Sequence, residues 1–192
     1  MKEHYIVLEN STLRLEPLTE SHVKQMRSLG SDNDIWRWYT ADLSTPDALE
    51  AWMMNRFDES QKAEKMSYAV ILKETGKVIG SSSYGHIDWQ EKGIEVGWTW
   101  LDKPYIGSGL NKHMKYLMLH HAFETMAIER LELRTDETNV RSRKAMEKIG
   151  ATFDGTLRNH RGTRGGRRRN TVIYSIIKPE WEHIKNTIFS EF

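Results

Sequence analysis

Hydrophobic and polar residues alternate along several short stretches of this chain, as in strands that bury one face. Leu13 and Leu15 alternate with Arg14 and Glu16 in Thr12–Leu18. Glu74-Thr75-Gly76 is a hairpin signal between two further runs. Seven strands are therefore expected, at Thr12–Leu18, Met66–Lys73, Lys77–Tyr84, Ile94–Leu101, Leu131–Thr135, Thr152–Arg158 and Thr171–Ile177.

Helical spacing and capping residues predict helices between these strands. Thr19 and Thr45-Pro46 are typical helix starts, and Gly150 is a typical residue just beyond a helix end. Ile35–Tyr39 is expected to be an aromatic loop or a short helical turn. The helices are expected at Thr19–Leu29, Thr45–Lys62, Ser108–Thr125, Asn139–Ile149 and Trp181–Phe189.

This order of elements predicts an α+β fold. Mixed hairpin and crossover connections favour a mostly antiparallel seven-stranded sheet with helices on both faces. No repeat, long linker or low-complexity tail interrupts the 192 residues, so residues 1–192 are expected to form a single domain.

Composition excludes several classes of function. The chain has no cysteine, which rules out disulfides, thiolate metal sites and cysteine nucleophiles. Lys+Arg is 28 and Asp+Glu is 27, so the overall charge favours neither nucleic acid nor membrane. His113, His120 and His121 do not share one helix face, and we predict no metal site. Without an apolar membrane span or a signal-peptide core, a cytoplasmic protein is expected.

The segment from Gly93 to Asn111 carries the most chemical information. Strict alternation would place Ile94, Val96, Trp98 and Trp100 on one strand face, and Glu95, Gly97, Thr99 and Leu101 on the other. Gly107-Ser108-Gly109 then precedes a helix. Glycines at a helix start let backbone N–H groups converge on a phosphate, although a tight strand–helix turn explains the same residues.

A second strand–helix junction adds to this picture. Leu131–Thr135 is followed by Asn139, an N-cap type of residue, and by Ser142 one turn along. Both side chains are expected to face the cleft beside the glycine loop. A plain capped helix would explain Asn139 alone.

Together these segments resemble the GNAT superfamily of acetyl-CoA-dependent N-acetyltransferases. They look most like its branch of Rim-type ribosomal-protein N-terminal acetyltransferases. The resemblance rests on E-V-G-W-T-W-L at 95–101, I-G-S-G-L-N at 106–111 and T-D-E-T-N-V-R-S-R-K-A-M-E-K-I-G-A at 135–151. It implies a sheet that splays open in the middle.

The resemblance also implies residue roles, with acetyl-CoA as co-substrate and no metal. Backbone amides of the glycine loop would hold the pyrophosphate, and the main chain of residues 98–100 would bind pantetheine. Glu95 matches the position of the general base, acting directly or through water. The cofactor-binding set is Trp98, Thr99, Trp100, Gly107, Ser108, Gly109, Leu110, Asn111, Asn139 and Ser142.

Two positions depart from the family pattern. Pro104 replaces the usual Arg or Gln before the loop, which puts one phosphate contact in doubt. Met146 replaces the Tyr that often protonates the departing thiolate, and Ser142 is the substitute that we name. A CoA-binding module without turnover is therefore an alternative, and Glu95 has the alternative of an ion-paired edge carboxylate.

The favoured acceptor is the α-amine of a protein or peptide. An α-amine has a pKa of about 8 and lysine about 10.4, so far more of the α-amine is neutral and able to attack at pH 7. A small-molecule amine (an antibiotic, a polyamine or an amino-acid-like toxin) is the alternative. Trp38, Tyr39 and Tyr84 are expected to line the acceptor pocket, although core packing would also explain these aromatic residues.

An arginine-rich stretch, Arg158–Asn170, carries six arginines and no acid. As a hairpin tip it would suit RNA, a ribosome surface or an acidic partner. The alternative is a solvated hairpin whose charges prevent edge pairing. A monomer and a homodimer are both compatible with the sequence.

Overall fold

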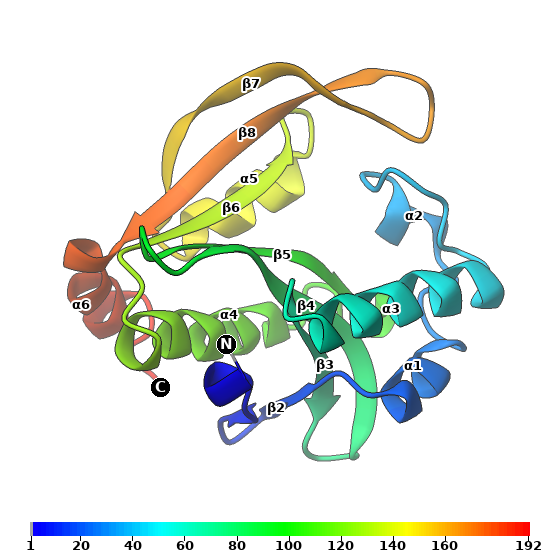
Figure 1. The fold of residues 1–192 in the computed structure, drawn as a ribbon, viewed down its shortest axis with the longest axis horizontal. Helices are drawn as coiled ribbons and strands as arrows, with labels where there is room; N and C mark the ends of the chain where they lie inside the picture. Colours follow the sequence, from blue (N-terminus) through cyan, green and yellow to red (C-terminus); the bar gives the residue numbers. More distant parts are fainter. Residues whose placement is uncertain (1) are drawn as a thin grey trace.

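The computed structural model describes residues 2–192, and its strands form one sheet (Figure 1). The strand order is β1-β2-β3-β4-β5-β6-β8-β7, antiparallel throughout the described chain except for β5 beside β6. The eighth strand, beyond the seven expected, is the two-residue β1. The strands are β1 (Leu8–Glu9), β2 (Leu13–Pro17), β3 (Met66–Leu72), β4 (Lys77–Asp88), β5 (Gly93–Leu101), β6 (Arg130–Asp136), β7 (Thr152–Gly162) and β8 (Arg168–Ile177).

Helices cover both faces of this sheet, as expected. Three contribute to the core on one face, with α4 running along the sheet, and three to the core on the other (Figure 1). The first group is α4 (Leu110–His120), α5 (Val140–Lys148) and α6 (Lys178–Thr187); the second is α1 (Glu20–Met26), α2 (Asn33–Trp36) and α3 (Pro46–Gln61). Short 3-10 segments occupy Lys2–His4 and Lys103–Tyr105, and a π-helical turn, His121–Thr125, follows α4.

Each face has its own hydrophobic core. Alternate residues of β6, such as Leu131 and Leu133, pack with α4, α5 and α6. Trp36 is fully buried in the second core with Leu49, and its indole N–H donates to the Gly30 carbonyl at 2.6 Å. The two different cores fix the strand registers, because a one-residue slip would move every side chain of a strand to the opposite face of the sheet.

The last hairpin is longer than its apolar pattern predicts. After a register shift between Leu157 and Arg161, the pairing continues to Gly162 opposite Arg168. Arg164 at its tip forms an ion pair with Asp42 at 3.1 Å. The hairpin thus reaches from the sheet toward the α2 region (Figure 1).

A β-bulge in β5 changes which side chains share a face. Ser81 pairs with Trp100 and Ser83 with Gly97, so Trp98 and Thr99 together stand opposite Ser82. Trp98 takes a positive φ of 51° at this point. The prediction of strict alternation is therefore wrong beyond Gly97.

The bulge brings Trp98 and Trp100 to the face of Glu95. Trp100 packs in the core under α1–α3, whereas Leu101 packs in the core under α4. The Thr99 hydroxyl turns toward α4 and receives a hydrogen bond from Lys115 at 3.0 Å. Lys115 is only 7% exposed, and its burial lowers the pKa of the ammonium to about 7.

We expect the free energy of unfolding to rise with pH between about 7 and 10 because of Lys115. In this range the lysine is neutral when folded but protonated when unfolded, so the unfolded chain binds more protons. This single group contributes roughly 1.4 kcal/mol per pH unit. Urea unfolding of Lys115→Met should give a shallower pH slope and greater stability at pH 7. A slope equal to that of the wild type would show that Lys115 remains charged in the fold.

The parallel strands β5 and β6 stay together only briefly. Gly93, Ile94 and Glu95 pair with residues 130–132, and beyond Glu95 the two strands part. The sheet is thus splayed in its middle, and one edge of β5 faces the opening. No helix within residues 2–192 has both the length and the apolar character needed to cross a membrane.

Candidate functional site

The glycine loop forms an open cradle at the start of α4. Gly107 and Gly109 have φ values of 80° and 89°, and Gly109 is the N-cap. A Cβ at either glycine would meet no atom within 4 Å. The Ser108 hydroxyl donates to the Tyr105 carbonyl at 2.6 Å and holds the turn in shape. The first-turn amides, including those of Leu110 and Asn111, lack helical partners, so the cradle suits a pyrophosphate.

The free edge of β5 supplies a second binding element. Along residues 98–100 the main chain faces the gap where β6 has diverged. The Tyr39 hydroxyl donates to the Thr99 carbonyl at 3.1 Å, which ties the α2 region to this strand. An extended ligand arm can hydrogen-bond to such an edge as an added strand would.

The start of α5 borders the same opening. Asn139 is the N-cap, and its side-chain oxygen accepts a hydrogen bond from the Ser142 backbone N–H at 3.1 Å. Ser142 is half-buried, whereas Met146 is buried in the core. Asn139 therefore serves the fold through its oxygen, and Ser142 carries a hydroxyl about one turn before Met146.

Glu95 is 7% exposed and lies in hydrogen-bond contact with His86 of β4. Its Oε2 lies 2.7 Å from Nδ1 of His86, whose side chain is 50% exposed, and 3.4 Å from Nε of Arg134. A Cβ at Gly97 would come within 3.1 Å of Oε1, so this glycine makes room for the carboxylate. An ionised carboxylate only accepts hydrogen bonds, so Nδ1 of His86 is the donor in this contact and Nε2 is the nitrogen that points away from Glu95.

A cavity of about 210 Å³ opens beside this pair. Burial favours the protonated form of Glu132, but hydrogen bonds from Arg134 at 2.7 Å and Arg130 at 3.1 Å outweigh it and lower the pKa of this carboxyl. Glu132 is thus held ionised by its two arginines. The lining residues are His86, Asp88, Glu91, Gly93, Ile94, Glu95, Arg130, Glu132 and Arg134.

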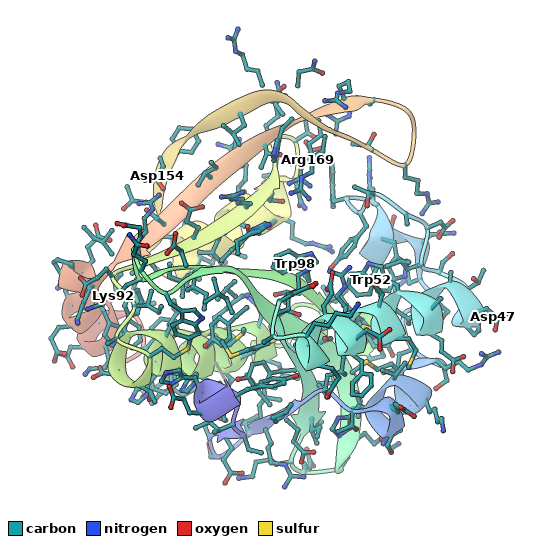
Figure 2. All side chains as sticks on the ribbon, in the orientation of Figure 1. Asp47, Trp52, Lys92, Trp98, Asp154 and Arg169 are labelled. Atoms are coloured by element: carbon teal, nitrogen blue, oxygen red, sulfur yellow. The ribbon has the colours of Figure 1, made fainter. Side chains whose placement is uncertain are left out.

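Aromatic residues flank the pair on its α3 side. The Trp98 ring lies 5.6 Å from the His86 ring and 4.4 Å from Lys65 Nζ, and Figure 2 shows it between β5 and α3. Tyr39 packs edge-on against Trp52 at 5.7 Å. Trp38 is half-buried, under the guanidinium of Arg37 at 5.3 Å.

Tyr84 does not face an acceptor, which corrects the prediction made for it. Its side chain is fully buried on the α4 face, and its hydroxyl donates to the Met118 carbonyl at 2.5 Å. Its ring packs against Tyr68 at 6.0 Å. Core packing, the alternative weighed for these aromatic residues, accounts for Tyr84.

Two residues of this site escaped the sequence reasoning in whole or in part. Arg134 stands two positions after Glu132 on a predicted strand, so alternation alone places both on one face. His86 has a positive φ of 47° where β4 shifts register, and alternation could not place it.

Comparison with known proteins identifies the family. Residues 12–152, well over half of the chain, match the family model described as an acetyltransferase (GNAT) domain. The chain belongs to the GNAT acetyltransferase family. It is an acetyl-CoA-dependent acyltransferase, a class in which acetyl-CoA serves as co-substrate and an amine as acceptor.

Individual relatives confirm the resemblance to the Rim-type branch. "Putative ribosomal N-acetyltransferase YdaF" of Bacillus subtilis (strain 168) is 25% identical, over 92% of this chain and 96% of its own. A crystal structure described as a "putative acetyltransferase" from T. thermophilus is 31% identical and covers 97% of this chain and 96% of its own, with a TM-score of 0.84.

A ribosomal-protein-S5-alanine acetyltransferase from Vibrio fischeri shares the fold. It matches with a TM-score of 0.75 and 18% identity, over 92% of this chain and 98% of its own. Among the described residues, no group of three or more His, Cys, Asp or Glu side chains is placed to hold a metal ion.

Proposed function

We propose that this GNAT protein transfers an acetyl group from acetyl-CoA to the N-terminal α-amine of a protein or peptide. The observation that carries the proposal is the Glu95–His86 pair, at 2.7 Å, on the sheet face beside the β5 edge. The curated relative named as a ribosomal N-acetyltransferase, similar over nearly the full length of both chains, supports this acceptor class.

Acetyl-CoA would supply the acetyl group, with the CoA thiolate as a good leaving group. The backbone of this chain would hold the CoA. The cradle of residues 107–110 and the amide of Asn111 would bind the pyrophosphate, and residues 98–100 the pantetheine arm. Asn139 and Ser142, at the start of α5, would contact the arm near its thiol. These groups fix where the reactive carbonyl lies relative to Glu95.

The reaction then requires two proton transfers, one from the amine and one to the sulfur. The attacking amine loses one as its nitrogen bonds to the carbonyl carbon, and Nε2 of His86 would take it. Glu95, the base expected from the sequence, would stabilise the imidazolium that forms through its contact with Nδ1. The sulfur gains a proton as it leaves, and the Ser142 hydroxyl is the donor that we assign. Solvent would then return a proton to Ser142 and accept the one held by His86, so that both residues regain their starting forms.

The acceptor itself would lie between the cavity and the aromatic residues of the α2–α3 region. Of the three aromatic residues expected to contact the acceptor, Trp38 and Tyr39 lie in this region, whereas Tyr84 is in the core. An α-amine suits a half-exposed histidine base, because about a tenth of the α-amine is already neutral at pH 7 and needs no base before it attacks.

Release of free CoA tests this proposal against a binding module without turnover. We expect acetyl-CoA hydrolysis alone to be slow, and CoA release to rise at least tenfold when a peptide with a free N-terminus is added. Both peptides lack lysine, and the control peptide has the same sequence with a blocked N-terminus. Equal CoA release with both peptides would contradict amine transfer, and no release with any amine would favour the non-catalytic alternative.

RNA contact through residues 158–170 is the other binding proposal. Arg164 and Arg167 at the tip pair with Asp42 and Asp136 of the same chain, which favours a structural role for these two arginines. Electrophoretic mobility of a structured RNA at low salt would reveal binding, and its absence would end this proposal.

A further inference from the structure

Two arginines of the β7–β8 hairpin face each other without a carboxylate between them. Arg161 of β7 stands directly opposite Arg169 of β8. Side chains of directly opposed residues lie on one face of a sheet, and like charges in such a pair are destabilising. Within the described part of the chain, neither guanidinium has a carboxylate oxygen within 4.0 Å.

Arg169 is half-buried and retains donors for a further partner. Its Nε donates to the Thr171 hydroxyl at 2.9 Å, and burial lowers the pKa of the guanidinium. His160 meets the same hydroxyl at 2.9 Å, and its pKa is lowered by burial and then by Arg161 and Arg169. A guanidinium has five N–H donors, so this cluster, with Arg169 half-buried and Arg161 exposed, has capacity for an anion.

The pair lies on the same sheet face as Glu95. Val172 and Tyr174 of β8 point into the core under α4, so Thr171 and Arg169 point to the other face. Figure 2 shows Arg169 beside β6, the strand between β8 and β5. Ser175 of β8 is level with Glu132 and Glu95, so the backbone of Arg169 lies six residues, about 20 Å, farther along the strand. The long side chain closes much of this separation, because the Glu95 carboxylate is near enough to raise the pKa of the Arg169 guanidinium against the larger effect of burial.

Two carboxylates near this face already form ion pairs with other arginines. Asp136 is buried and pairs with Arg167. Glu132 pairs with Arg130 and Arg134. Asp136 and Glu95 partly offset the lowered pKa of the Arg169 guanidinium without forming an ion pair with it. Arg161 and Arg169 therefore keep donors for a negative charge from outside the chain.

We propose that Arg161 and Arg169 bind a carboxylate carried by the amine acceptor. In a peptide, this group would be an acidic side chain at the second or third residue, with the α-amine at Glu95 and His86. The same positive charges disfavour a polyamine acceptor. This inference rests on the proposed function and names the substrate class of that site.

Paired peptides test the inference. We expect a peptide with Asp or Glu at positions 2 and 3 to exceed its Asn or Gln counterpart in kcat/KM at least tenfold. Arg169→Gln and Arg161→Gln should remove most of this preference through KM, with kcat nearly unchanged, and Arg169→Lys should restore part of it. Arg168→Gln is the matched control, because Arg168 points to the opposite face and binds Asn159.

The outcomes separate this inference from the proposed function. Equal rates for acidic and amide peptides, or an equal loss in Arg168→Gln, would overturn the carboxylate site and leave N-terminal acetylation standing. If no peptide is acetylated, the proposed function fails, and inorganic sulfate still tests the anion site. Sulfate should then raise the Tm of the wild type more than that of Arg169→Gln. An equal rise in both proteins would overturn the site.

Discussion

Glu95→Gln is expected to lower kcat about a hundredfold or more, with little change in acetyl-CoA affinity or Tm. The amide is isosteric with the carboxylate and can still hydrogen-bond to His86, but it cannot offset the charge that the ring gains with a proton. His86→Gln should cause a comparable loss. Because the two residues act as a unit, the double variant should be scarcely slower than either single one.

The matched control for this prediction is Glu129→Gln. Glu129 precedes β6 and forms only a surface ion pair with Lys178, at 3.3 Å, so its variant should keep wild-type turnover. Steady-state kinetics at saturating acetyl-CoA measure all four variants. Full activity in Glu95→Gln would show that Glu95 is not the base. It would then be the ion-paired edge carboxylate, the alternative stated in the sequence analysis.

Gly109→Val is expected to abolish measurable acetyl-CoA binding in calorimetry. A β-branched residue at φ 89° is strained, and its side chain would fill the space where the cradle's amides converge. We expect at least a hundredfold rise in Kd, together with a stability loss of about 1–2 kcal/mol from the backbone.

Gly76→Val separates these two effects. Gly76 has a φ of 66° in the β3–β4 turn, and a Cβ there would also meet no atom within 4 Å. Its variant should lose similar stability while keeping wild-type affinity for acetyl-CoA. Unchanged binding by Gly109→Val would mean that the loop is only a tight turn.

The apolar pattern predicted the sheet and most of its helices because burial on two faces leaves a strong periodic signal. It failed at Trp98, where one extra residue in β5 reverses the faces that follow. Gly97 is compatible with a bulge, but E-V-G-W-T-W-L does not require one, since tryptophan suits either face. The consequence is large, because Trp98 now shares its face with Glu95.

The pattern also underestimated the hairpin and did not place His86 beside Glu95. Polar residues extend the pairing of β7 and β8, and they carry no hydrophobic period. Tyr84 and His86 stand two apart on β4, yet one is in the core and the other beside Glu95, because the strand shifts register near His86. Local backbone irregularities of this kind arise from tertiary pairing, which single-sequence periodicity does not record.

The central claim is tested most directly by locating the transferred acetyl group. A peptide with a free N-terminus and one internal lysine would be incubated with acetyl-CoA and the wild-type protein at pH 7, and then fragmented in a mass spectrometer. Our account predicts acetyl on the α-nitrogen and an unmodified lysine. Acetyl on the lysine side chain, or a peptide left unmodified while a small-molecule amine is acetylated, would contradict it.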